Sequence, residues 1–203
     1  PPAILSSALR HALGLAADAP ALPRAAGKSS DRSVLVASAD PEVSGALRRA
    51  GFSVRPVAFT PFDAEAASKI THFETYNRTA ASQRVADIVS AVRQAPSAPL
   101  VADGDAALAA LLAEAVVPIR RAVLDVDGFD DTSDDAFLER LYIPGLRRAG
   151  DVQTAAALAG PGVIVHNSGG RFMLTGVRVE ARRLTAREIV DALKASAPLL
   201  RPR

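Results

Sequence analysis

The feature of this sequence that most constrains its fold is an alternation between short, wholly apolar runs and longer segments with helical spacing. Residues 100–102 form one such run, which stops at Asp103 and is followed by an alanine- and leucine-rich segment. Leu108, Leu111 and Leu112 recur in that segment at the i, i+3, i+4 spacing of an α-helix. A strand without polar alternation is typical of a sheet buried on both faces. The pattern therefore favours a parallel sheet between two helical layers.

The same alternation runs through most of the chain. We predict a single α/β domain with a mostly parallel sheet of about six strands and helices on both faces. The predicted strands are residues 33–38, 52–59, 99–102, 121–126, 162–165 and 177–181. The predicted helices are residues 4–15, 42–50, 78–94 (capped by Asn77), 106–115, 134–141, 145–159 and 185–195, and residues 60–76 are expected to form a long loop.

Two segments organise the 203 residues: an N-terminal helix and linker over residues 1–32, and the α/β domain over residues 33–203. The chain begins Pro1-Pro2, without methionine, and is expected to be a processed or cloned portion of a longer protein. The N-terminal helix has an apolar stripe that we expect to pack against the domain or a partner. This stripe consists of Ile4, Leu5, Leu9 and Leu13.

Composition excludes several classes of function. The absence of cysteine excludes disulfides, thiolate catalysis and zinc–cysteine sites. The net charge is only +2, and many arginines occur as separate pairs rather than in one basic block, so no nucleic-acid partner is expected. We find no apolar run long enough to span a membrane and no signal-peptide pattern, and the cellular location stays open.

Five stretches of the chain carry a resemblance to a known fold family. Residues 73–92, 99–115, 121–129, 142–167 and 171–182 together resemble the later part of α/β-hydrolase-fold proteins. They look most like acetylxylan-esterase-like and dienelactone-hydrolase-like bacterial sequences. The resemblance implies that residues 33–38 correspond to the third strand of the usual eight and residues 177–181 to the last. The first two strands of the fold would then be missing.

The resemblance also implies where a catalytic triad would lie. The serine of a G-x-S-x-G turn between strand and helix would fall on Gly104, which has no nucleophile. The acid would follow the strand that ends at His166, where Asn167 and Ser168 stand instead. The histidine would follow the last strand, and no histidine occurs after His166. The sequence therefore lacks the three groups of a Ser–His–Asp mechanism at the expected positions.

A different set of polar residues lies at the predicted strand ends. The carboxyl ends of parallel strands meet at one edge of the sheet, so we expect Asp103, Asp125 and His166 to converge there. Two carboxylates and an imidazole can activate water, which makes these three the candidate catalytic residues. The candidate ligand-binding residues at the same edge are Ser38, Gly104, Asn167 and Ser168.

The acidic loop at residues 125–135 has two interpretations. Asp125, Asp127 and Asp130 are candidate ligands for Ca²⁺ or another divalent cation, which prefers closely spaced carboxylate oxygens. The alternative is helix capping, in which Thr132 or Ser133 is the N-cap and the following aspartates lie near the positive end of the helix dipole. No other cofactor is indicated.

Two functional hypotheses from different classes follow. The first is hydrolysis of a small carboxylic ester or lactone without a covalent serine intermediate. In this mechanism Asp103, Asp125 and Asp127 hold a cation or activate water, and His166 is the base. The second is a catalytically empty domain that binds a small molecule or supports a larger polypeptide. The strand at residues 52–59 is expected at a sheet edge, which offers a surface for a homodimer, although Arg55 and Pro56 would weaken strand pairing there.

Overall fold

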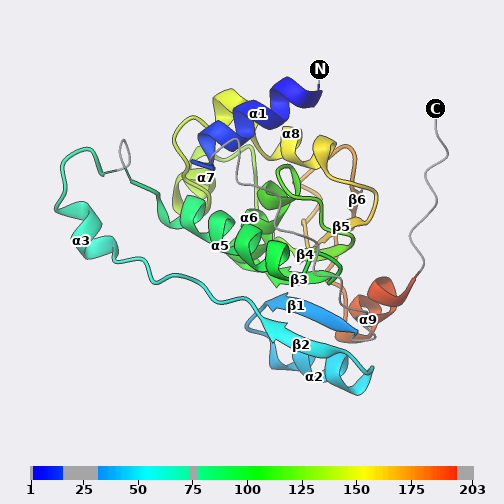
Figure 1. The fold of residues 1–203 in the computed structure, drawn as a ribbon. Helices are drawn as coiled ribbons and strands as arrows, with labels where there is room; N and C mark the ends of the chain where they lie inside the picture. The colour runs from blue at the N-terminus through cyan, green and yellow to red at the C-terminus, as the bar shows by residue number, and fades with distance from the viewer. Residues whose placement is uncertain (1, 16–31, 74–76, 196–203) are drawn as a thin grey trace.

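The computed structural model describes residues 2–15, 32–73 and 77–195, and its central feature is a parallel sheet of six strands (Figure 1). The strand order across the sheet is β2-β1-β3-β4-β5-β6. The predicted α/β class and parallel sheet are thus confirmed. The strands are β1 (Ser33–Ala37), β2 (Ser53–Pro56), β3 (Leu100–Asp103), β4 (Ala122–Asp125), β5 (Val163–His166) and β6 (Arg178–Val179).

Helices cover both faces of the sheet, as the apolar strands require. On one face, α5 (Ala80–Gln94), α6 (Gly104–Glu114) and α8 (Asp151–Leu158) pack over Leu35 and its neighbours. On the other face, α2 (Pro41–Arg49) and α9 (Ala186–Lys194) pack over Val34 and Val36. Successive residues of β1 therefore belong to different core clusters, in accord with the two-residue period of a strand.

The order of the strands reverses next to β1. The chain passes from β1 outward to β2 at the edge, and then returns to place β3 on the other side of β1. In open parallel sheets, ligands bind beyond the carboxyl ends of the strands at such a reversal. The register of the pairing aligns Asp103 with Asp125, and Asp125 with His166, so three of the predicted site residues end adjacent strands.

Several predicted boundaries are wrong, each for a local reason. The N-cap of α5 is Thr79 rather than Asn77, because the Thr79 hydroxyl also donates a hydrogen bond of 2.7 Å to the carbonyl of Tyr142. The expected loop at residues 60–76 contains α3 (Ala64–Ser68). This helix buries no side chain, so its sequence shows no large apolar residues at helical spacing. The expected helix at residues 145–159 is divided by Gly150, at φ +97°, into the 3-10 helix η1 (Arg147–Ala149) and α8.

The N-terminal helix α1 (Pro2–Ala12) packs against the domain. Leu9 and Leu13 are fully buried, which confirms the prediction for them, whereas Ile4 is 65% exposed and its prediction is wrong. The side chain of Leu5 lies outside the described part of the structure. Helix α1 contacts α8 and η1 and lies far from β2, so it does not cover that edge of the sheet (Figure 1).

A buried acidic residue lies where α1 meets the end of α6. Glu114 accepts a hydrogen bond of 3.1 Å from the Ile119 amide through Oε2, and its Oε1 has no hydrogen-bond partner. Burial raises the pKa of Glu114 to about 8, against a smaller lowering effect of the Ile119 amide. From α1, Ser6 and Arg10 donate hydrogen bonds to the carbonyls of Ala115 and Val116 next to it. The carboxyl group is therefore protonated at neutral pH in the folded chain.

Glu114 makes stability depend on pH in a defined direction. Between its ordinary pKa of 4.5 and about 8, the folded chain holds a proton at Glu114 that the unfolded chain has lost. The free energy of unfolding should therefore fall as the pH rises through this window and level off above it. We expect Glu114→Gln to remove this fall and to be more stable than the parent above pH 8, as measured by chemical denaturation. The control is Glu65→Gln on the exposed helix α3, and an unchanged slope in Glu114→Gln would contradict the assignment.

Candidate functional site

A pocket of about 270 Å³ lies at the carboxyl ends of β1, β3, β4 and β5, between the first turns of α2 and α9. It occupies the place at which the strand order reverses, and we call it the switch-point pocket. Its lining combines apolar and polar side chains. It is lined by Ser38, Asp40, Glu42, Val43, Val101, Ala102, Asp103, Asp125, His166, Arg183, Leu184, Thr185, Ala186 and Ile189.

Ser38 and Asp103 form the closest polar contact in this pocket. The Ser38 hydroxyl donates to Oδ2 of Asp103 at 2.5 Å and accepts a hydrogen bond of 3.1 Å from the Asp40 amide. Asp103 is the residue before α6, yet its carboxylate makes no capping bond to that helix. It is engaged instead by Ser38, so the structure brings these two predicted residues together.

Asp125 is buried and has a hydrogen-bond partner on each oxygen. Its Oδ1 accepts from the Asp127 amide at 2.9 Å and from the Asn167 side chain at 2.7 Å. Its Oδ2 lies 3.0 Å from Nε of Arg183, which also reaches Asp40 with Nη2 at 3.3 Å. Asp125 thus accepts hydrogen bonds from two N–H donors and forms an ion pair with one guanidinium group. Asp125 therefore acts here as an anchor for Arg183 and Asn167.

His166 is only 1% exposed and faces the pocket with one unused donor. Its Nδ1 accepts a hydrogen bond of 3.2 Å from the Leu184 amide, and no described residue accepts one from Nε2. Burial lowers the pKa of His166, Asp125 opposes this effect, and Arg183 and Arg182 add to it. The imidazole is therefore neutral, with its proton on Nε2, which makes it a donor toward an acceptor in the pocket.

The other predicted ligand-binding residues, Asn167, Ser168 and Gly104, do not line the pocket. Asn167, at φ +58°, holds Asp125, and the buried hydroxyl of Ser168 accepts a hydrogen bond of 3.4 Å from the Gly170 amide. Gly104 has φ +56° and starts α6, but it does not line the pocket. The ligand-binding roles of these three residues stay predictions.

The structure does not bring together the predicted metal ligands Asp125, Asp127 and Asp130. Over the described ranges, no group of three or more His, Asp or Glu side chains could hold a metal ion. The side chain of Asp127 is 73% exposed, with Nη2 of Arg140 at 4.0 Å. Asp130 accepts hydrogen bonds from the hydroxyl and amide of Thr132, which hold its pKa below 3.8. The carboxylates of Asp125 and Asp130 thus each accept a hydrogen bond within their own turn, and Ser133 caps α7 (Asp134–Arg140) as the capping interpretation expects.

Two residues of the site escaped sequence reasoning. Arg183 follows Arg182 in a polar segment, and Arg182 instead pairs with Glu188 at the start of α9. Nothing in the sequence distinguishes the two arginines. Asp40 caps α2 through Oδ1, and its Oδ2 also contacts Arg183. A pair of adjacent arginines is thus a signal that one can face inward, although it does not say which.

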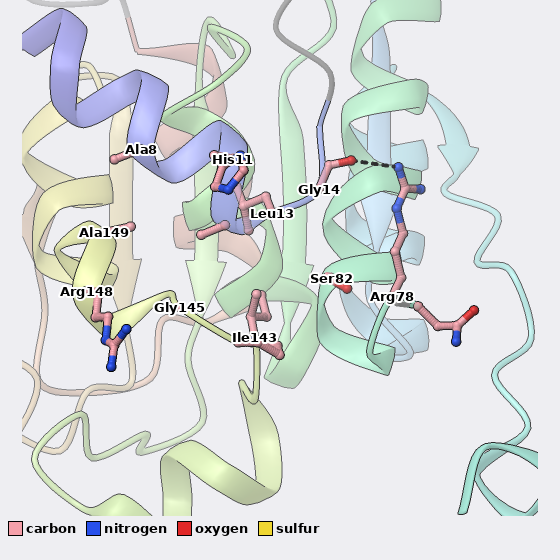
Figure 2. Close-up of a pocket in the computed structure, with 13 residues that line it drawn as sticks. Ala8, His11, Leu13, Gly14, Arg78, Ser82, Ile143, Gly145, Arg148 and Ala149 are labelled. Carbon is pink, nitrogen blue, oxygen red and sulfur yellow. Dashed lines mark hydrogen bonds between the residues drawn. The ribbon is translucent and has the colours of Figure 1, made fainter. Parts of the chain in front are cut away.

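A larger pocket of about 780 Å³ lies between α1, the start of α5 and residues 143–149 (Figure 2). Arg78 donates a hydrogen bond of 3.2 Å to the carbonyl of Gly14 at its margin. Figure 2 shows the guanidinium groups of Arg78 and Arg148 well apart, on different sides of this space. The basic side chains of this pocket therefore do not converge on one ligand group.

Comparison with protein-family models, with curated proteins and with solved structures finds no match for this chain. No helix within residues 2–15, 32–73 and 77–195 is both long and apolar enough to cross a membrane. The functional conclusion therefore depends on the geometry of the pockets.

The tautomer of His166 can be measured directly. We expect long-range ¹H–¹⁵N NMR at neutral pH to show a protonated Nε2 and an unprotonated Nδ1, with a pKa below the ordinary value of 6.5. Arg183→Gln removes a neighbouring positive charge and should raise the pKa of His166. Arg187→Gln, on the exposed face of α9, should leave the pKa unchanged and serves as the control. Protonation at Nδ1 would contradict the geometry of the site.

Proposed function

We propose that this chain is a small-molecule-binding domain whose ligand occupies the switch-point pocket and carries hydroxyl groups. The observation that carries the proposal is the Nε2 donor of His166, which borders the pocket and has no acceptor among the described residues. A ligand oxygen in the pocket would accept this hydrogen bond. The Asp103 carboxylate, already bound to Ser38, would accept a hydrogen bond from a ligand hydroxyl group.

The state of the polar groups favours binding over catalysis. Both oxygens of Asp125 are engaged, and the Nδ1 lone pair of His166 is used by the Leu184 amide. A general base needs a lone pair directed at the substrate, but the Leu184 amide takes the one lone pair of the His166 ring, and three donors already surround Asp125. The apex of the β3–α6 turn is Gly104, which supplies no nucleophile.

The binding proposal is tested by titrating the protein with glycerol, erythritol and glucose while the backbone amides are observed by NMR. We expect saturable shifts at Asp40 and Leu184, whose amides bond to Ser38 and His166. Asp103→Asn should weaken the tightest of these ligands by roughly tenfold, the value of one good hydrogen bond. Asp191→Asn on the far part of α9 is the matched control. Shifts outside the pocket, or equal affinity in Asp103→Asn, would count against the proposal.

A second candidate function is hydrolysis of a small ester or lactone. The 2.5 Å hydrogen bond from Ser38 to Asp103 favours it, because a carboxylate at this distance can accept the hydroxyl proton during attack. In the mechanism drawn from sequence alone, Asp103 and Asp125 activate water and His166 is the base. The engagement of Asp125 and His166 favours Ser38 as the attacking group instead.

The two functions are separated by an assay with p-nitrophenyl acetate and γ-butyrolactone. The binding proposal predicts no turnover above the buffer rate. Turnover that is lost in Ser38→Ala and after treatment with a serine-directed phosphonate would establish the second candidate. Turnover that resists the phosphonate and is removed by EDTA would instead support water activation at a metal ion. Ser44→Ala, on the outer part of α2, is the control for serine substitution.

A further inference from the structure

A separate pocket of about 360 Å³ lies between α3 with its flanking residues and the helices α5, α6 and α7. We call it the strap pocket. It is lined by Asp105, whereas Asp103 lines the switch-point pocket, so the two pockets flank the turn from β3 to α6. The strap pocket therefore also belongs to the carboxyl-end side of the sheet, where α/β proteins bind ligands.

One wall of the strap pocket is apolar and aromatic. Phe62 and Phe73 meet edge to face, with ring centroids 6.0 Å apart. Opposite them lie Tyr142 and Leu138, and Leu138 is 58% exposed although it borders a hollow. Exposed large apolar side chains that gather around a concavity mark a surface that a ligand covers.

The polar end of the pocket has two guanidinium groups around one carboxylate. Asp105 lies 2.9 Å from Nε of Arg140 and 3.5 Å from Nη1 of Arg84. Arg140 is further committed, since it donates to the Asp127 carbonyl and its guanidinium lies over the ring of Phe129. Asp105 is thus satisfied mainly by Arg140.

Arg84 is the group whose hydrogen-bonding capacity is unused. Its side chain is 28% exposed, and it donates no hydrogen bond to any described acceptor beyond its loose ion pair with Asp105. A guanidinium carries five N–H donors in a planar fork that matches a carboxylate. The other acidic residue of the lining, Glu139, is exposed to solvent, where its charge is screened.

We propose that the strap pocket binds a small organic carboxylate with an aromatic or branched apolar body. The carboxylate forms a paired hydrogen bond with Arg84, and the apolar body packs against Phe62, Phe73 and Tyr142. An amine of the same shape is disfavoured, because it meets two guanidinium groups and a carboxylate that is already paired. A neutral amide fills the same volume but forms a weaker hydrogen bond to Arg84. This site is independent of the ligand proposed for the switch-point pocket.

The proposal is tested with phenylacetate as the probe, by calorimetric titration of the full chain. Phenylacetamide and phenethylamine serve as matched neutral and cationic probes. We expect phenylacetate to bind at least tenfold more tightly than phenylacetamide, and phenethylamine to bind least. Arg84→Gln should reduce the affinity for phenylacetate by at least tenfold, and Arg84→Lys by less. Arg93→Gln, on the same helix but outside the pocket, should leave it unchanged.

Several outcomes of this experiment would overturn the proposal, and one further variant tests which pocket the probe occupies. Equal affinities for phenylacetate and phenylacetamide, no saturable binding, or full affinity in Arg84→Gln would each overturn the proposal. The comparison of the three probes on the parent chain decides the matter even where Arg84→Gln does not fold, which its thermal unfolding would reveal. Asp103→Asn alters only the switch-point pocket and should leave phenylacetate binding intact. A loss of phenylacetate binding in Asp103→Asn would show that the probe occupies the switch-point pocket, and would also overturn the assignment.

Discussion

The structure depends on the burial of helix α6 between α5 and α8. Every residue from Ala106 to Glu114 is buried, and α6 contacts both neighbouring helices as well as β3 and β4. Alanine at five of the eleven positions of this helix lets its neighbours approach closely, and the interspersed leucines fill the space that remains. Because β3 is buried as well, the chain must turn abruptly between two buried elements. That turn places Asp103 and Asp105 on opposite sides and so generates both pockets.

The same constraint decides how the acidic groups are used. Carboxylates beside a buried helix need partners, because an unpaired charge away from water is costly. Asp105 has Arg140, Asp125 has Arg183 and Asn167, and Asp103 has the hydroxyl of Ser38. These partners fix the carboxylates in place. A carboxylate fixed in this way is suited to orient a ligand that donates a hydrogen bond to it.

Much of the fold could be predicted because its signals are local. The apolar runs at β1, β3, β4 and β5 specify buried strands, and parallel topology then brings Asp103, Asp125 and His166 to one edge without any knowledge of side-chain contacts. Helix α3 could not be found in this way, since it buries nothing.

The parts of the site that could not be predicted depend on long side chains that cross between elements. Arg183 reaches β4 from the segment before α9, and Arg84 and Arg140 reach α6 from two other helices. An arginine has the same sequence signature whether it points to solvent or to such a partner. The metal prediction has a related weakness, because an acidic spacing also suits turns: Asp125 and Asp130 accept hydrogen bonds from the amides of Asp127 and Thr132.

The conformation of Gly104 links this turn to the proposed function. Its φ of +56° lies in the left-handed region, where any residue with a Cβ is strained. Space is not the obstacle, because a Cβ there would meet only Arg140 Nη2, at an ordinary distance of 3.9 Å. A side chain with a nucleophile would fit at this apex at the cost of backbone strain, and glycine makes the same turn without it. The tight turn that buries α6 and separates the two pockets is therefore made without strain at Gly104 and without a nucleophile at its apex.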